Sequence, residues 1–259
     1  MILLIGGTSE TASLASGLAA DGYEVLVSTA TDTPLAIGDH PRISRRVGRL
    51  GEDGMVSLGK AKGVRAIVDA AHPYAVAVHE AVQVAARRLG IPCFVFLRPE
   101  AMTPGDPVCF AADHAEAAEM AFAGGLPVLL TTGSRNLAPY AEAARRTGVP
   151  LAVRVLDAPE SLAACRAAAI PEDRIIVGRG PFSVEENLAA IRRFDIGMIV
   201  TKESGRAGGF NAKLAAAEQA NCRIIVLRRP ETPASSLTFA HPAALIAALR
   251  NLVPPAVKS

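Results

Sequence analysis

The chain has 259 residues, of which half are hydrophobic, and a formal net charge of +2. At roughly 150 residues per domain this fits one large or two compact domains, and the composition excludes fibrous, collagen-like and disordered chains. The small charge gives no indication of a nucleic-acid partner, and no apolar run approaches the roughly 18 to 20 residues of a membrane span. Without an export signal at its start, the chain is expected to be cytoplasmic, as a monomer or small homo-oligomer.

Short runs rich in Val, Ile and Leu alternate with Ala-rich amphipathic stretches along the whole chain. This alternation predicts parallel strands joined by crossover helices. The strands expected in the first half are Ile2–Ile5, Glu24–Ser28, Ile43–Val47, Ala66–Asp69 and Cys93–Phe96. The helices expected there are Ser9–Ala20, which opens on a serine cap, and Ala75–Leu89, which ends at a glycine.

A connector rich in Pro and Gly, Arg98–Pro107, separates this half from a second series of elements. The strands expected beyond it are Val128–Thr132, Ala152–Leu156, Ile175–Val177, Met198–Thr201 and Ile224–Leu227. The helices expected are Asp113–Phe122, Leu137–Arg146, Pro159–Ala168, Ser183–Arg193, Asn211–Asn221 and Pro242–Leu252.

The pattern predicts an α/β protein of two Rossmann-like domains with mainly parallel sheets, about five strands in each. A single ten-stranded sheet would be long for an open twisted structure. We place the domains at residues 1–105 and 106–259, although an edge strand of one sheet could come from chain beyond the connector. Ligands of such folds bind at the carboxyl ends of the strands, so we expect an interdomain cleft there.

The first expected strand is followed by Gly6, Gly7, Thr8 and Ser9, at the start of a helix. Glycines allow a tight turn, and a helix N-terminus supplies free N–H groups, so this loop is typical of phosphate binding; a turn without a ligand is the alternative.

The second expected strand ends at Ser28 and Thr29 rather than at the Asp or Glu that commonly holds the ribose of NAD. Since hydroxyls do not repel a 2′-phosphate, the sequence favours NADPH. Arg45, Arg46 and Arg49 are possible partners of that phosphate, or simply solvated charges.

His72 lies between the end of a strand and a helix, where ligands arrive, and is either a site residue or structural. The other histidines lack this context and are expected to be structural or exposed. Three Gly-containing loops of the second half carry basic side chains: 131–136, 178–183 and 201–209. Together they predict a basin for a polyanionic ligand.

Several catalytic motifs are absent, among them G-x-S-x-G, H-E-x-x-H and the Walker lysine loop. The four cysteines, Cys93, Cys109, Cys165 and Cys222, are widely spaced and predict no metal site. Hydride transfer needs little from the protein beyond holding two rings together without water, so it fits this lack of an evident triad.

Six segments, ILLIGGTSE, DAAHPYA, FLRP, TTGSRNL, GRGPFSVEEN and TKESGRAGG, occur in this order between residue 2 and about residue 209. Their set resembles the precorrin-6A reductase family (CobK/CbiJ) of cobalamin biosynthesis. The resemblance implies NADPH-dependent reduction of a tetrapyrrole, with hydride added at C19 and a proton at C18. A cobalt-containing substrate, or a non-catalytic two-domain protein that binds an anionic ligand, is the alternative.

The resemblance also assigns roles to residues of this chain. Gly6, Gly7, Thr8 and Ser9 would bind the cofactor, with Ser28 and Thr29 near its adenosine end and Arg49 as the further candidate named above. The substrate would contact Ser134, Arg135, Arg179, Glu203, Ser204, Gly205 and Arg206. His72 is the first candidate for the proton donor and Lys202 the second, with solvent as the alternative.

Overall fold

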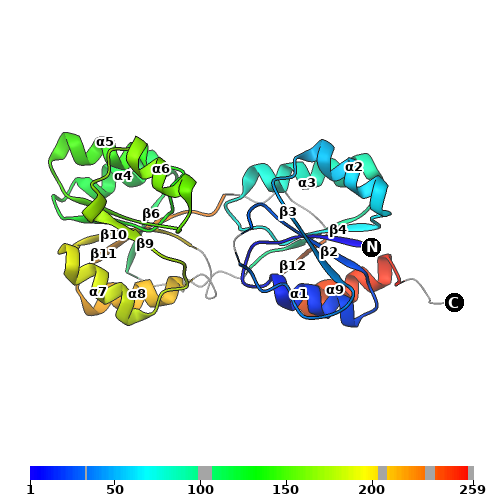
Figure 1. The fold of residues 1–259 in the computed structure, drawn as a ribbon. Coiled ribbons are helices and arrows are strands. Elements are labelled where there is room, and N and C mark those ends of the chain that lie inside the picture. The colour runs from blue at the N-terminus through cyan, green and yellow to red at the C-terminus, as the bar shows by residue number, and fades with distance from the viewer. Residues whose placement is uncertain (33, 99–106, 204–208, 231–236, 256–259) are drawn as a thin grey trace. The chain divides into compact units, whose positions relative to one another are not determined.

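The computed structural model describes residues 1–32, 34–98, 107–203, 209–230 and 237–255 (Figure 1). Two compact units account for these residues. Unit 1 comprises the described residues before 99 and after 229, and unit 2 comprises those from 107 to 229. Each unit has one parallel sheet with helices on both faces, as the sequence predicts (Figure 1).

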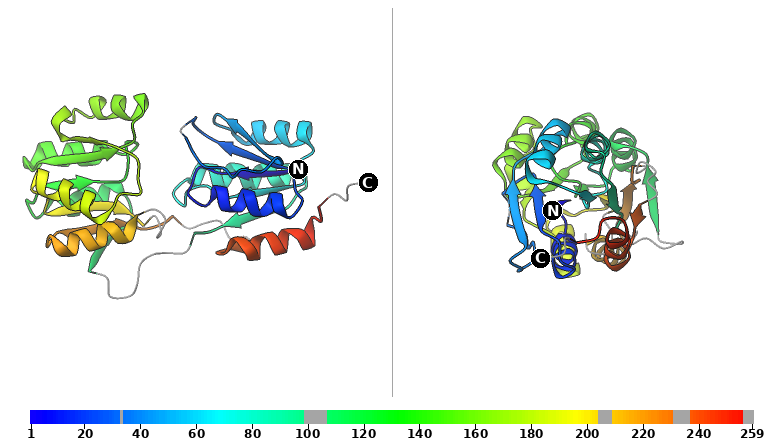
Figure 2. Two further views of the ribbon diagram at one scale, coloured as in Figure 1. Left: turned by 60° about the horizontal axis from the view of Figure 1, so that its bottom comes forward. Right: turned by 90° about the vertical axis from the view of Figure 1, so that its right-hand side faces the viewer.

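The sheet of unit 1 has the strand order β12-β5-β4-β1-β2-β3. Its strands are β1 (Ile2–Ile5), β2 (Val25–Thr29), β3 (Ile43–Val47), β4 (Ala66–Asp69), β5 (Cys93–Phe96) and β12 (Thr238–Phe239). Its helices are α1 (Thr11–Ala20), α2 (Glu52–Lys62), α3 (Val76–Leu89) and α9 (Pro242–Leu252). Helices α1 and α9 lie side by side on one face, and α2 and α3 cover the other (Figures 1 and 2).

Alternation along β1 divides the core of unit 1 into two layers. Ile2 and Leu4 pack with α1 and α9, whereas Leu3 and Ile5 pack with α2 and α3. Because successive side chains of a strand point to opposite faces, a fully apolar strand requires helices on both sides.

The sheet of unit 2 has the order β6-β11-β10-β7-β8-β9. Its strands are β6 (Val108–Ala111), β7 (Val128–Leu130), β8 (Leu151–Val155), β9 (Ile175–Val177), β10 (Met198–Lys202) and β11 (Arg223–Leu227). Its α-helices are α4 (His114–Phe122), α5 (Ala138–Thr147), α6 (Pro159–Ala167), α7 (Val184–Phe194) and α8 (Phe210–Gln219). Helices α4, α5 and α6 lie on one face and α7 and α8 on the other (Figure 1).

The outer strands of the two sheets differ from the expectation of five strands each. β12, close to the end of the chain, pairs with β5 of unit 1, and β6, which follows β5 along the chain, pairs with β11 of unit 2. Residues 237–255 thus lie in unit 1, whereas the predicted second domain, 106–259, includes them. Strands of four and two residues carry little periodicity, so only their hydrogen-bond partners reveal which sheet they join.

Helix α2 is a second difference, because the sequence analysis does not predict it. Gly54 and Gly59 lower its helix propensity. A Cβ atom at Gly59 would lie 2.5 Å from Leu89 Cδ1 of α3, so this glycine permits the close packing of the two helices. Gly59 therefore weakens the helical pattern of the sequence but is required by the packing of α2 against α3.

Candidate functional site

Most of the predicted site residues that the structure describes lie at the point in each sheet where the strand order reverses. In unit 1, β1 is adjacent to β4, and in unit 2, β7 is adjacent to β10. The loops that follow these four strands contain most of the residues predicted to bind ligands. In doubly wound folds this crevice at the carboxyl ends of the strands is the usual ligand site.

The glycine loop after β1 is shaped by hydrogen bonds within unit 1. The Gly6 N–H donates to the Ser28 carbonyl (3.0 Å), and the N–H groups of Gly7 and Thr8 donate to Thr11 Oγ1 (3.1 and 3.2 Å). A Cβ atom at Gly6 would lie 2.7 Å from Thr11 Cγ2, so glycine is needed there. Since these three N–H groups already have acceptors, the candidates for binding a phosphate are the residues that follow Thr8.

Arg98, from the FLRP segment after β5, holds this loop. Its Nη2 donates to Glu10 Oε2 (2.5 Å) and to Ser9 Oγ (3.3 Å), and the side chain is buried. Burial by itself raises the pKa of Glu10, but the hydrogen bond and charge of Arg98 outweigh it and hold that pKa below its ordinary value. The negative charge of Glu10 is thus compensated beside α1, where an anionic ligand would otherwise meet it.

Two arginines of β3 contact the hydroxyls at the end of β2. Arg46 Nη1 donates to Ser28 Oγ (2.8 Å), and Arg45 Nε donates to Thr29 Oγ1 (3.1 Å). The register of the parallel pair places Ser28 opposite Arg46. Arg49 lies further on and is exposed, so the guanidinium groups next to these hydroxyls are those of Arg45 and Arg46.

His72 lies in the loop after β4, next to the glycine loop. Thr8 Oγ1 donates to the Ala70 carbonyl (3.2 Å) and links the two loops. The Tyr74 N–H donates to His72 Nδ1 (3.4 Å), so a neutral His72 carries its proton on Nε2. The half-buried ring thus accepts a backbone hydrogen bond from its own loop.

A buried ion pair that the sequence analysis missed lies below this loop. His79 Nδ1 contacts Asp69 Oδ2 at 2.7 Å, and His79 Nε2 lies 3.2 Å from the His72 carbonyl. Burial by itself lowers the pKa of His79, but the hydrogen bond and charge of Asp69 outweigh it and raise that pKa. Protonated His79 donates from both nitrogens and ties the His72 backbone to β4.

In unit 2, Lys202 at the end of β10 lies among other basic groups. Burial, and then the charge of Arg135, lower its pKa from the ordinary value. Burial and the charge of Lys202 lower the pKa of His114 to about 4, so this histidine is neutral at pH 7. The structure therefore brings Lys202 and Arg135 together electrostatically, as a polyanion basin requires.

Neutral His114 supports the loop after β7. The Asn136 side-chain amide donates to His114 Nε2 (3.0 Å), and His114 Nδ1 lies 2.9 Å from the buried Tyr140 hydroxyl. With one nitrogen accepting and the other donating, the ring holds the segment that carries Arg135. The sequence predicts a structural or exposed His114, and the observed role is structural.

The remaining predicted substrate residues differ in their surroundings. Ser134 Oγ donates to Ser161 Oγ (3.3 Å), and Arg179 is exposed after β9. Glu203 is buried in an ion pair with Arg229, so its carboxylate anchors the end of β10. Next to it along the chain, Ser204, Gly205 and Arg206 lie outside the described residues.

In the loop after β7, the buried hydroxyl of Thr132 has no hydrogen-bond partner among the described residues. Buried polar groups are usually paired, so an unpaired one directly after β7 is typical of a place where a ligand or water completes the contact.

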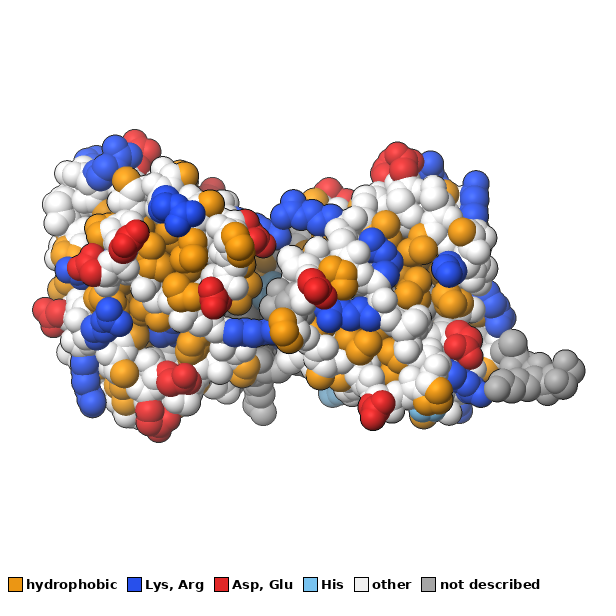
Figure 3. Space-filling view, viewed as in Figure 1, with side chains coloured by type: hydrophobic (Ala, Val, Ile, Leu, Met, Phe, Trp, Pro, Cys, Tyr) orange, Lys and Arg blue, Asp and Glu red, His pale blue; other side chains and the backbone are white. Residues whose placement is uncertain are grey.

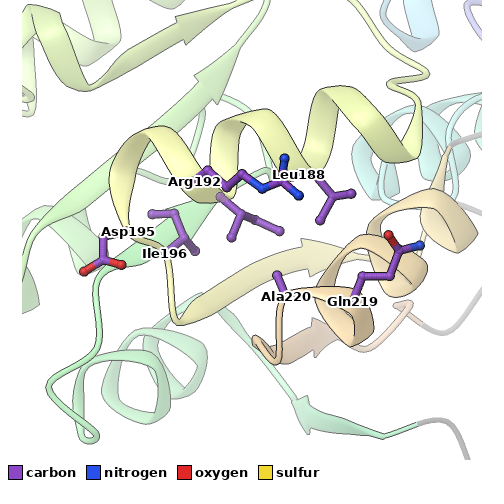
Figure 4. A pocket seen from close by; sticks show the side chains of 7 residues that line it. Leu188, Arg192, Asp195, Ile196, Gln219 and Ala220 are labelled. Carbon is purple, nitrogen blue, oxygen red and sulfur yellow. The ribbon is translucent and has the colours of Figure 1, made fainter.

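A surface pocket of about 340 Å³ lies elsewhere in unit 2 (Figure 4). It is formed by the carboxyl ends of α7 and α8 and by the turn before β10, with lining residues Leu188, Ile191, Arg192, Asp195, Ile196, Gln219 and Ala220. This pocket is at the opposite end of the sheet from the loops described above.

The described surface carries both signs of charge. On the face drawn in Figure 3, acidic and basic side chains are interspersed over each unit. In the ranges that the structure describes, no cluster of three or more His, Cys, Asp or Glu side chains is arranged to hold a metal ion. None of the helices in those ranges has the length and apolarity to cross a membrane.

Comparison with known proteins places these features in one family. Residues 1–250 match the family model described as Precorrin-6x reductase CbiJ/CobK. The precorrin-6A reductase of Rhodococcus erythropolis is 35% identical over 252 residues, which cover 95% of this chain and 96% of that protein. The cobalt-precorrin-6A reductase of Priestia megaterium is 32% identical over 232 residues, covering 89% and 91%. A solved structure, CobK precorrin-6A reductase, superimposes with a TM-score of 0.79 at 27% identity, covering 97% of this chain and 96% of that one.

Proposed function

Since the chain belongs to the precorrin-6x reductase CbiJ/CobK family, we propose that it transfers a hydride from NADPH to the C18–C19 double bond of precorrin-6A. The protein is an oxidoreductase of cobalamin biosynthesis that acts on precorrin-6A or its cobalt form. In the proposed reaction, C19 takes the hydride and C18 takes a proton, which yields precorrin-6B and NADP⁺. The observation that carries the cofactor choice is the contact of Arg46 with Ser28 at the end of β2.

The polar groups of unit 1 fit a phosphorylated dinucleotide. A Cβ atom at Gly7 would have nothing within 4 Å, so there is open space beside the loop for a pyrophosphate to approach. Ser9, whose hydroxyl is held by Arg98, opens the stretch whose N–H groups would bind that pyrophosphate. Arg45 and Arg46 would hold the 2′-phosphate, which NADH lacks. When bound, NADPH supplies the hydride.

The basic groups of unit 2 fit a substrate with several carboxylates. Arg135 is exposed and Lys202 half-buried, and the two interact electrostatically at the ends of β7 and β10. We assign the carboxylate contacts to these two residues, together with Ser134, Arg179 and Arg206 from the family resemblance. Binding of a carboxylate would relieve the repulsion between the two cations.

Two side chains are suited to supply the proton to C18. An imidazolium at His72 would have a proton to donate, and Lys202 has a lowered pKa, which makes its ammonium group a stronger acid. The variants His72→Ala and Lys202→Met separate them. The donor's removal should lower kcat and abolish one limb of its pH profile, whereas a variant with the wild-type profile removes that residue from the mechanism.

The activity test uses NADPH absorbance with precorrin-6A and with its cobalt form. Loss of absorbance with either substrate supports a reductase, and the comparison of rates identifies the substrate. Binding of the tetrapyrrole without NADPH oxidation would instead favour a non-catalytic binding protein. Fluorescence titration should give a lower Kd for NADPH than for NADH, and equal Kd values would contradict the role of the β3 arginines.

The division of ligands between the units has its own test. Arg135→Ala should weaken tetrapyrrole binding about 10- to 100-fold, because a charge-assisted hydrogen bond contributes roughly 1.5 to 3 kcal/mol. Its Kd for NADPH should stay at the wild-type value. Loss of NADPH binding with intact tetrapyrrole binding would reverse the assignment.

A further inference from the structure

Unit 2 buries two cations on one face of its sheet, beside the loops already described. Arg154 is the penultimate residue of β8 and Lys213 lies in the first turn of α8, with exposures of 6% and 9%. Neither forms an ion pair with a carboxylate among the described residues. A buried charge without a counter-ion is costly, so their proximity requires an explanation.

The contacts of Arg154 leave one of its donors unused. Its Nη1 donates to Asn187 Oδ1 (2.7 Å), and the guanidinium stacks on the Phe182 ring at 4.2 Å from the ring centre. The Nε–H group is buried and has no hydrogen-bond partner in the described part of the chain. Stacking covers the face of the guanidinium, so the edge that carries Nε remains the side from which a carboxylate or phosphate oxygen can bind.

The acidic group whose charge acts on Arg154 is already engaged elsewhere. Glu186 acts on Arg154 through its charge, but its Oε2 accepts the Ser183 N–H (2.7 Å) in the capping box of α7. Its side chain is exposed at the helix start. Glu186 therefore completes the helix cap and does not pair with the buried guanidinium.

Lys213 is in an unfavourable place for a cation. Its Nζ makes one long hydrogen bond, to the Gly209 carbonyl (3.5 Å), and it lies near the positive end of the α8 dipole. Burial, and then the charge of Arg154, lower the pKa of Lys213 to about 8. Burial, the helix dipole and the Arg154 charge all disfavour this ammonium group, and a bound anion would offset all three.

We infer that Arg154 and Lys213 form a subsite that binds one oxyanion group of a ligand at the carboxyl end of the second sheet, with Asn187 holding the guanidinium in place. Nε of Arg154 and Nζ of Lys213 are its donors, and Phe182 covers one side. This subsite deepens the proposed function, since a tetrapyrrole carboxylate is the occupant in keeping with the ligand assigned to unit 2. A cofactor phosphate is the other source of the same chemistry.

Lys213→Met tests the subsite, because methionine keeps the length of the side chain and removes its charge. Lys60→Met, on the exposed face of α2, is the matched control, and Lys213→Arg is the variant that retains a cation. The measurements are the Kd of precorrin-6A from absorbance titration without NADPH, the Kd of NADPH from fluorescence, and Tm without ligand. None of them depends on turnover.

We expect Lys213→Met to raise the Kd of the tetrapyrrole about 10- to 100-fold, with the Kd of NADPH unchanged. Its Tm should rise, because an uncompensated buried charge is gone, and Lys213→Arg should restore part of the binding. A rise in the Kd of NADPH alone would identify the occupant as a phosphate. Wild-type Kd values for both ligands, or a lower Tm with unchanged binding, would overturn the subsite and leave a structural lysine.

Failure of the proposed function would look different. If wild-type protein bound the tetrapyrrole without oxidising NADPH, the reductase assignment would fail, while the Kd shift of Lys213→Met would still test the subsite. If wild-type protein oxidised NADPH and Lys213→Met bound both ligands normally, only the subsite would be rejected.

Discussion

The two units share the order of five strands, β5-β4-β1-β2-β3 and β11-β10-β7-β8-β9, but differ in how they compensate buried charge. In unit 1, the buried ionic groups are paired within the chain: Asp69 with His79, and Arg98 with Glu10. In unit 2, Glu203 pairs with Arg229, but Arg154 and Lys213 have no carboxylate partner among the described residues. The same scaffold thus carries neutralised loops in one unit and an excess of positive charge in the other.

Under the proposed function, strand order defines where a ligand would bind in each unit, and local side chains define which ligand it would be. Both sheets place loops from adjacent strands at the same topological position, between β1 and β4 and between β7 and β10. Unit 1 presents glycines and hydroxyls there, whereas unit 2 presents Lys202 and Arg135. Fold and site chemistry are therefore separate properties, as in other doubly wound proteins.

The largest expected effect is the loss of stability when the buried ion pair between Asp69 and His79 is broken. Asp69→Ala should destabilise the protein by about 3 to 5 kcal/mol, because His79 loses its buried partner. Urea unfolding measures this loss, and Asp53→Ala, which removes an exposed partner of Arg88, should change little. Similar losses in both variants would contradict the importance of the buried pair.

The same pair has a defined pH dependence. The pKa of His79 is raised in the folded protein, so its contribution to stability is complete below pH 6.5 and is lost as the pH rises through the raised value. Asp69→Ala should lack this component. An unchanged pH profile of the variant would argue against a protonated His79.

The contribution of Lys213 in unit 2 to stability should change with pH in the opposite direction. The pKa of Lys213 falls from 10.5 to about 8 on folding, so between these values the unfolded chain binds more protons. Stability of the ligand-free protein should therefore rise with pH across that range, by on the order of 3 kcal/mol from this group. Lys213→Met should lack this rise in urea unfolding, and a slope equal to wild type would assign it to other groups.

A smaller effect, on the affinity for NADPH, is expected from a substitution beside the end of β2. Arg46→Met should raise the Kd of NADPH about 10- to 100-fold and leave that of NADH nearly unchanged, because only NADPH has the 2′-phosphate. Arg49→Met is the companion variant, since the sequence analysis selected that arginine. A larger loss with Arg49→Met would reverse the assignment made from the contacts of Arg46.

The smallest expected effect is the loss of stability when one glycine of each unit is replaced by alanine. Gly7 and Gly133 both have positive φ angles (121° and 86°), and a Cβ atom at either would meet nothing within 4 Å. Alanine should cost about 1 kcal/mol of stability at each, through backbone strain alone. Gly7→Ala should also weaken NADPH binding and Gly133→Ala tetrapyrrole binding; the reverse pattern would exchange the ligands of the units.

Much of the fold could be predicted because its elements are locally periodic. Six elements have the predicted bounds: Ile2–Ile5, Ile43–Val47, Ala66–Asp69, Cys93–Phe96, Ile175–Val177 and Pro242–Leu252. The other predicted elements differ by one or two residues at one or both ends. The first helix begins at Thr11 rather than Ser9, and the side chains of Ser9 and Glu10 are instead bonded to Arg98, which follows β5. Contacts of that kind leave no trace in the local pattern.

Several buried residues at the strand ends could not be predicted for the same reason. Arg154 interrupts an apolar strand and Lys213 lies in an Ala-rich helix, which marks each as unusual but does not show that the charge of one acts on the other. Asp69 and His79 pair because the first turn of α3 lies against the end of β4, which the sequence does not show. Burial and proximity, which determine the pKa values, are properties of the packed molecule.

The sequence by itself determined the alternation of strands and helices and the position of glycine loops after strands, because both depend on neighbouring residues. It also carried the motifs by which the family is identified. Only the tertiary structure decided that β12 joins unit 1 and β6 joins unit 2, and which charges are neutralised at the ends of the two sheets. Edge-strand pairing and charge compensation join residues far apart in the chain, and only packing brings those residues into contact.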